Sequence, residues 1–222
     1  MKVTLITHTP DPEKVVASAA KLCYSSSNIE SLMDGLTEEK TEEFIKKLTS
    51  MGHESPLEHC SFTFGVEGVS RALLAQLTRH RLASYSVKSQ RYVKEGEFKY
   101  IIPQSIQEDS FMLIKYKKLM ERIQEFYDYA ISNGVPREDA RFVLPNACET
   151  KIIMTMNIRS LLHLFSLRCC NRAQWEIREM ADKMLEICKE CAPTLFSKAG
   201  ANCVRGKCPE GEMCCGNPKG GK

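Results

Sequence analysis

The chain lacks any apolar run long enough to span a membrane, and its first residues, 1–6, lack the long apolar region and the cleavage site of a signal peptide. It also lacks an internal repeat of solenoid length. Its formal net charge of +3 is too small for a general binder of polyanions. With 43% hydrophobic and 27% charged residues among 222, the composition predicts a soluble, cytoplasmic protein with one sizeable core.

Cysteine is abundant in a chain that shows no secretion signal. Its 11 cysteines are therefore expected to be reduced thiols or metal ligands rather than disulfides. Residues 200–222 are rich in Gly, Pro, Lys and Cys without apolar periodicity, which predicts an irregular tail after a main domain of residues 1–199. A zinc site at Cys203, Cys208, Cys214 and Cys215 stays open, although these cysteines lack the paired spacing typical of zinc sites.

Periodicity in the main domain predicts both strands and helices. Alternating or continuous apolar patterns predict strands at residues 2–9, 62–66 and 151–157. Helical spacing and capping residues predict helices at 12–24, 37–51, 69–80, 111–130, 158–168 and 173–191.

The most unusual stretch runs from Arg79 to Tyr92. It combines arginine, histidine, lysine and serine with almost no acidic residue, and it follows an apolar helical run that would hold it rigidly. Guanidinium groups bind phosphate or carboxylate with two hydrogen bonds, and serine hydroxyls donate to the same oxygens. The stretch is therefore interpreted as an anion site, with a solvated basic turn as the alternative. Its first part, Arg79 to Arg81, is expected to lie in the last helical turn and the rest in a loop.

Other polar residues extend this interpretation. Arg141, Arg159 and Arg168 each lie beside apolar sequence, where an unpaired guanidinium would be costly, so either internal carboxylates or a shared anion must balance them. The segment from His53 to His59 holds two His and two Glu, but Pro56 interrupts the helix that a zinc site of the His-Glu-x-x-His type needs. A polar ligand-binding turn is the preferred interpretation.

The pattern Arg79-His80-Arg81-x2-Ser84-x4-Ser89-x-Arg91 resembles the signature of flavin-dependent thymidylate synthases. Further segments of residues 1–199 are similar to the same family, which leaves only the tail outside the resemblance. These segments are 52–59, 140–145, 157–161, 167–168 and 173–176.

The resemblance implies a single-domain α/β (α+β) fold with a mixed or antiparallel sheet flanked by long helices. It further implies a homotetramer with active sites between subunits, in which FAD and dUMP bind side by side. The implied reaction methylates dUMP to dTMP, with 5,10-methylenetetrahydrofolate as carbon donor and NADPH as reductant.

Individual roles follow from the same resemblance. The residues implied to contact FAD are Ser55, Glu58, Arg79, His80, Arg81, Asn157, Arg159 and His163. Those implied to hold dUMP are Gln76, Arg79, Ser89, Gln90, Arg91, Arg141 and Arg168. His53 is implied to lie on the nicotinamide or folate side of the pocket, with Arg168, Ser89 and His53 as the catalytic group.

Chemistry refines two of these roles. Uracil C5 is a poor nucleophile, so Arg168 is expected to stabilise negative charge that develops on a pyrimidine carbonyl. Ser89 could add to the ring as a nucleophile, but its neighbours supply no evident base, so a phosphate or ring ligand is preferred. The chain departs from the family at Ser86-Val87, where Asn-Glu is common, and at Cys23, where Ser is common.

Two other functions remain as alternatives. One is a nucleic-acid-binding module with a metal-bound cysteine tail, which the near-neutral charge disfavours. The other is a different nucleotide-binding flavoprotein on the same scaffold.

Overall fold

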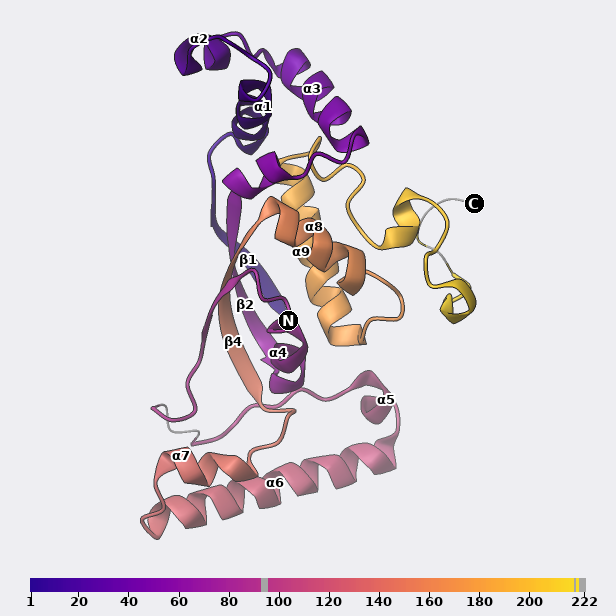
Figure 1. Cartoon of the computed structure of the whole chain (residues 1–222). Coiled ribbons are helices and arrows are strands. Elements are labelled where there is room, and N and C mark those ends of the chain that lie inside the picture. The colour runs from indigo at the N-terminus through magenta and orange to yellow at the C-terminus, as the bar shows by residue number, and fades with distance from the viewer. Residues whose placement is uncertain (93–95, 218, 220–222) are drawn as a thin grey trace. The chain divides into compact units, whose positions relative to one another are not determined.

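A four-stranded sheet runs through the chain in the order β1-β2-β4-β3. The computed structural model describes residues 1–92, 96–217 and 219 (Figure 1). The strands are β1 (Lys2–His8), β2 (Ser61–Ser70), β3 (Ser84–Val87) and β4 (Glu149–Asn157). Near the strand ends, backbone hydrogen bonds join Thr9 to Ser61, Ile158 to Cys60 and Arg71 to Cys148, which is the pairing of antiparallel neighbours. The helices and this sheet confirm the predicted α+β class.

The chain forms two compact units, each assembled from separate segments. The first comprises Met1–Lys2, Val66–Arg79 and Ser86–Ile152, and the second comprises Val3–Gly65, His80–Tyr85 and Ile153–Lys222. Helices of the first unit are α4 (Arg71–Leu77), α5 (Gln104–Gln107), α6 (Ser110–Ser132), α7 (Arg137–Ala140) and the 3-10 turn η2 (Arg141–Val143). Those of the second are α1 (Pro12–Leu22), α2 (Ile29–Asp34), α3 (Glu38–Ser50), η1 (Ser55–His59), α8 (Ile158–Arg168), α9 (Trp175–Cys191), η3 (Asn202–Arg205) and η4 (Gly211–Met213).

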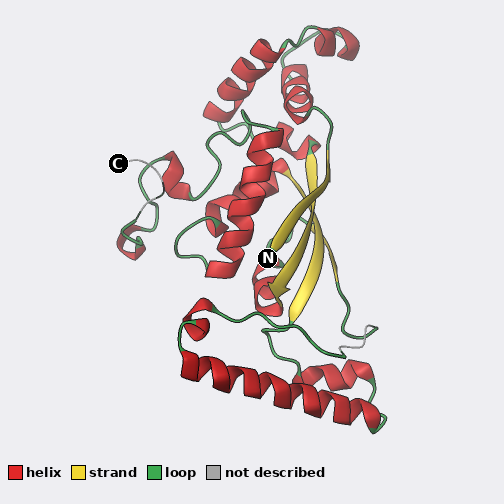
Figure 2. Cartoon of the chain, turned by 180° about the vertical axis from the view of Figure 1, so that it is seen from behind, coloured by secondary structure: helices red, strands yellow, loops and turns green. Residues whose placement is uncertain are grey.

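In the second unit, α8 and α9 lie along one face of the strands (Figure 2). Alternate residues of β2 face them: Phe62 and Phe64 are fully buried, and Phe62 meets Phe196 edge to face at a ring-centroid distance of 5.8 Å. Phe165 of α8 also contacts Phe196, at 6.1 Å. This aromatic core fixes α8, which carries several of the predicted site residues.

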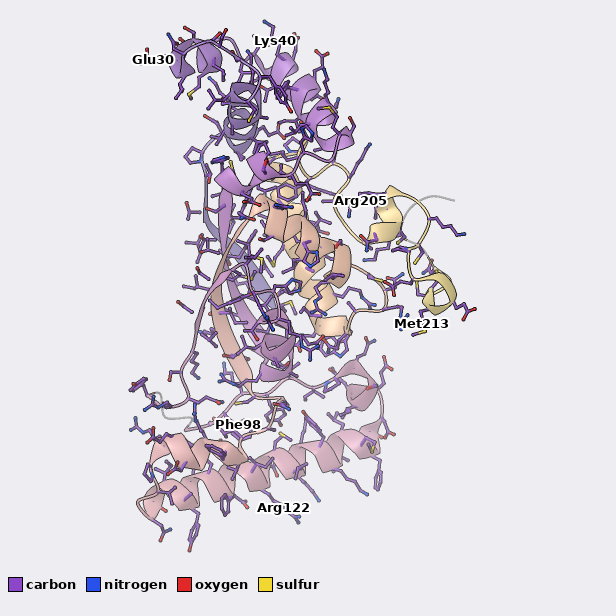
Figure 3. The ribbon with its side chains drawn as sticks, viewed as in Figure 1. Glu30, Lys40, Phe98, Arg122, Arg205 and Met213 are labelled. Carbon is purple, nitrogen blue, oxygen red and sulfur yellow. The ribbon has the colours of Figure 1, made fainter. Side chains whose placement is uncertain are left out.

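In the first unit, the long helix α6 begins at a capped end. Asp109 accepts hydrogen bonds from the backbone N–H groups of Phe111 and Met112, which satisfies two donors that a helix N-terminus leaves unpaired. Met120 packs with Phe98 and Cys148 in a buried cluster. Figure 3 labels Phe98 on one side of α6 and Arg122 on the other. The helix is therefore amphipathic, as its sequence predicted.

The signature segment is organised differently from the prediction. Helix α4 ends at Leu77, so Arg79 to Arg81 lie beyond the helix rather than in its last turn. The following residues are not all loop, because Ser84–Val87 form the edge strand β3. Helix α2 was not predicted at all, although Asn28 caps it by accepting from the backbone N–H of Ser31.

The tail has more order than its composition predicted. It contains η3 and η4, and Arg172 donates from Nη1 to the carbonyl oxygen of Met213 over 2.5 Å. Arg205 and Met213 mark these two turns in Figure 3. In the described ranges, the structure contains no helix with both the length and the apolar character that crossing a membrane requires.

Candidate functional site

An arginine at the start of α8 is held by two carboxylates. Arg159 donates from Nε to Glu54 Oε2 over 3.2 Å and from Nη1 to Glu58 Oε1 over 2.5 Å. These hydrogen bonds and the glutamate charges raise the Arg159 pKa, the bond to Glu58 contributing most. The Arg159 side chain remains 50% exposed, so its guanidinium is oriented yet accessible.

Asn157 fixes the end of the helix that presents Arg159. Its side-chain oxygen accepts from the backbone N–H of Ser160 over 2.8 Å, as an N-cap residue does. The Asn157 side chain is thus committed to capping, and Ser55, which begins η1, is exposed. The predicted flavin residues Ser55, Glu58, Asn157 and Arg159 all belong to the second unit.

His80, Arg168 and His163 form a second group in this unit. Arg168 donates from Nε to His80 Nε2 over 3.0 Å, and the rings of His80 and His163 meet edge to face at 5.9 Å. Only 9% of His80 is exposed. Burial, the charge of Arg168 and that of His163, in decreasing order, lower the His80 pKa to about 4. The imidazole is therefore neutral at pH 7, with its proton on Nδ1.

Tyr85 contacts the backbone of His80. Its hydroxyl donates to the carbonyl oxygen of His80 over 2.9 Å, and burial raises the Tyr85 pKa to about 12. Tyr85 consequently stays protonated and keeps donating at any physiological pH. Arg81, by contrast, is exposed.

His53 lies at the surface of the second unit. The hydroxyl of Tyr24 lies 3.3 Å from His53 Nδ1, and both side chains are exposed. The imidazole is accessible, as a residue that contacts a substrate must be. Cys23, the neighbour of Tyr24, is also exposed and is the C-cap residue of α1.

The first unit carries most of the predicted nucleotide residues, beginning with Arg91. This arginine reaches Glu138 Oε2 from both Nε, at 3.0 Å, and Nη2, at 2.9 Å. Both side chains are about half exposed, at 51% and 52%. Arg141 donates from Nε to the carbonyl oxygen of the same Glu138 over 3.1 Å. Glu138 therefore links two predicted dUMP-binding arginines.

Ser89 and Gln90 have local roles in this unit. The Ser89 hydroxyl accepts from the backbone N–H of Arg91 over 3.2 Å. Gln90 is buried, and its side-chain amide donates to the thiol of Cys148 over 3.4 Å. Ser89 thus holds the turn that positions Arg91.

The remaining predicted residues lie around α4. Gln76 is on α4 and is partly buried, and its carbonyl oxygen accepts from the backbone N–H of Arg79 over 3.4 Å. The Arg79 side chain is exposed. Arg79 belongs to the first unit, whereas His80 and Arg81 belong to the second, so the boundary between the units falls within the signature.

A cavity of about 220 Å³ adjoins Arg168 in the second unit. It lies between the end of α8, the residues that follow it and the tail. Its walls include Arg168, Arg172, Asn202, Cys203 and Cys208. The tail therefore borders a predicted catalytic residue, although the sequence interpretation had left it outside the site.

No metal centre is formed by the described ranges. Within residues 1–92, 96–217 and 219, no three His, Cys, Asp or Glu side chains are grouped to hold a metal ion. This includes the tail cysteines, which are free thiols. The zinc hypothesis for Cys203, Cys208, Cys214 and Cys215 thus lacks a ligand set there.

Sequence reasoning missed three residues that shape these groups: Glu54, Glu138 and Tyr24. Glu54 stood in a quoted family segment without a role. Glu138 lies 47 positions from Arg91, so no local spacing could pair them. For Arg159 the sequence left an internal carboxylate and a bound anion as alternatives, and for Arg91 it favoured an anion. In the structure each arginine has a glutamate partner, because distant segments meet on folding.

Comparison of the sequence with known proteins identifies the family to which this chain is similar. A family model described as "Thymidylate synthase complementing protein" matches residues 4–194. A protein of Clostridium tetani named flavin-dependent thymidylate synthase is 53% identical over 232 aligned positions, which cover 97% of this chain and 93% of the relative. A Geobacter sulfurreducens protein of that name is 52% identical, with 97% and 94% covered. One from Pyrococcus furiosus is 42% identical, with 96% and 91% covered.

Proposed function

Because this chain belongs to the thymidylate synthase complementing protein family, we propose that it is an FAD-dependent enzyme that converts dUMP to dTMP. In this proposal 5,10-methylenetetrahydrofolate is the carbon donor and NADPH the reductant. The observation that carries the proposal is the bond between Arg168 and His80, because it orients a cation beside a histidine that is neutral at pH 7.

The orientation of Arg168 supports its catalytic role. Donation from Nε fixes the plane of the guanidinium, and a neutral His80 adds no positive charge to compete for an anionic partner. A preorganised cation stabilises charge that develops in a transition state without reorganising. Arg168 would stabilise negative charge on a pyrimidine carbonyl oxygen as uracil C5 becomes nucleophilic.

The donor set of the second unit fits a flavin dinucleotide. Arg159 and Arg81 present accessible guanidinium groups, and Ser55 presents an accessible hydroxyl, which are the donors that a pyrophosphate accepts from. When bound, FAD would supply the hydride for the reaction. Arg159 and Arg81 would bind and orient it, with Glu54 and Glu58 holding Arg159 in place.

In the first unit, Arg91 and Arg141 would hold the nucleotide phosphate. Arg91 pairs with the Glu138 carboxylate, Arg141 donates to the Glu138 carbonyl oxygen, and Ser89 fixes the backbone turn before Arg91. The carboxylate contact of Arg91 is half exposed, so a pair of this kind contributes only about 0–1 kcal/mol. A dianionic phosphate can therefore replace or share it at small cost.

We also propose that the chain acts as a cytoplasmic homotetramer. Large apolar side chains remain exposed in the single chain, including Phe142 at 81% and Leu82 at 80%. Exposed apolar groups of this size favour association that covers them. Light scattering coupled to size exclusion should give four times the chain mass, and a monomer at micromolar concentration would contradict the assembly.

The main test uses the flavin spectrum. The purified protein should be yellow, and its absorbance should change when dUMP is added. Arg168→Ala should keep the flavin but lose turnover, whereas Arg205→Gln, an exposed tail change, should keep both. A colourless protein that instead binds DNA, or an Arg168→Ala variant with near-normal turnover, would contradict the proposal.

A further inference from the structure

The tail brings two free thiols into contact. The thiols of Cys208 and Cys214 lie close enough to interact, with the turn η4 between them in sequence. Both are partly exposed and neither is in a disulfide. They are also attached to the folded part of the second unit, because Arg172 bonds to Met213 and lies 3.8 Å from Glu210 Oε2.

The two thiols have different environments. The backbone N–H of Gly216, the Cys208 thiol, the Cys215 thiol and the charge of Arg172 together lower the Cys214 pKa, against a smaller opposing effect of burial. At Cys208 the N–H of Glu210 lowers the pKa, but burial and the neighbouring Cys214 and Cys203 outweigh it, so that pKa is raised. A thiolate in electropositive, accessible surroundings beside a second thiol is the arrangement found in redox-active cysteine pairs.

We propose that Cys208 and Cys214 form a reversible dithiol–disulfide switch in which Cys214 is the attacking thiolate. The oxidant is a low-molecular-weight disulfide. Cys214 attacks one of its sulfur atoms and expels a thiolate, which gives a mixed disulfide. Cys208 then loses its proton, attacks Cys214 Sγ and expels the second thiolate. The protein thiols lose two electrons and two protons, and the small disulfide becomes two thiols.

The switch acts on the wall of the cavity beside Arg168. Pro209 and Glu210 lie inside the loop that the disulfide closes, and both line that cavity together with Cys208. A covalent closure reduces the conformations open to such a loop. Oxidation therefore restrains this wall, and reduction releases it.

The first experiment maps the bond. Reduced full-length protein is treated with oxidised glutathione, quenched with N-ethylmaleimide and analysed by peptide mass spectrometry. The expected product is a Cys208–Cys214 cross-link. Cys208→Ser should stop at a glutathione adduct on Cys214, and Cys214→Ser should react about tenfold more slowly at Cys208. Cys23→Ser, which removes an exposed thiol outside the tail, should leave the cross-link unchanged.

Several results would overturn the proposal. These are a cross-link between Cys214 and Cys215 or between Cys203 and Cys208, faster modification of Cys208 than of Cys214, or no cross-link at all. Stoichiometric zinc on the purified protein that protects the tail thiols would also overturn it.

Two further measurements test the mechanism and the effect. Arg172→Gln should slow adduct formation at Cys214 by up to about threefold at pH 7, because it removes a positive charge that favours the Cys214 thiolate. Arg205→Gln serves as the control.

Cleavage by endoproteinase Glu-C after Glu210 or Glu212 should be about tenfold slower in oxidised protein, because local opening is restricted. Equal cleavage before and after oxidation would contradict restraint of the wall.

Discussion

The nearly buried imidazole of His80 should make the stability of this protein depend on pH. Its pKa is lowered from 6.5 to about 4, first by burial and then by the charges of Arg168 and His163. In the unfolded chain the imidazole takes up a proton as the pH falls through 6.5, but the folded protein resists protonation until about 4. The stability that the neutral His80 contributes to the folded protein is therefore fully present above pH 6.5, and it is lost as the pH falls towards 4.

The size of this effect follows from the shift. A pKa change from 6.5 to about 4 means that protonation of His80 can lower the free energy of unfolding by at most about 3.4 kcal/mol. Solvent at the edge of the ring reduces this, so we expect a loss of roughly 2 kcal/mol. His80→Gln should remove this part of the pH dependence. His59→Gln, at an exposed position, should retain it.

Urea unfolding between pH 7.5 and 4.5, followed by circular dichroism, measures the free energy of unfolding for the three proteins. Histidine NMR titration of the folded protein gives the pKa directly. Arg168→Gln should raise the His80 pKa only in part, because burial is the larger cause. A His80 titration midpoint at 6 or above, or an unchanged pH slope in His80→Gln, would refute this reasoning.

Other substitutions test single contacts. Phe165→Ala should lower the free energy of unfolding by about 3–5 kcal/mol, because this buried ring fills the core between α8 and β2; a loss below about 1 kcal/mol would contradict that packing. Thr37→Ala should cost about 1 kcal/mol in the same urea assay, since its hydroxyl accepts from the N–H of Lys40 at the start of α3. Glu138→Gln should tighten dUMP binding up to about fivefold in calorimetry by freeing Arg91, with Asp139→Asn as control; weaker binding would mean that Glu138 positions Arg91 instead.

Local signals predicted most helices correctly because they act over one or two turns. Thr37 caps α3 as expected, and Gly52 takes the left-handed conformation just after that helix, with φ of 71°. Asp11, the residue before α1, lies at φ 45° and makes no side-chain cap bond. Pro12 at the first helical position suffices to begin that helix.

The signature segment shows where local reasoning fails. The apolar spacing through Leu73 and Leu77 continued to His80, which favoured a helix through Arg81. The helix ends at Leu77 instead, and His80 is buried beside Arg168, 88 positions away in sequence. A buried histidine fits both a helical stripe and a tertiary contact, so the sequence pattern alone cannot distinguish them.

The carboxylates of the site explain why an anion-binding interpretation and observed ion pairs are compatible. Glu58 reaches Arg159 across 101 positions of sequence, and Glu138 reaches Arg91 across 47, so neither pair leaves a signal in local spacing. Yet each arginine is about half exposed, where an ion pair contributes little free energy and a ligand phosphate loses little by competing. A fully buried carboxylate would have made the same arginines unavailable. The exposure of these pairs, more than the presence of their glutamates, therefore decides that the arginines remain suited to binding anions.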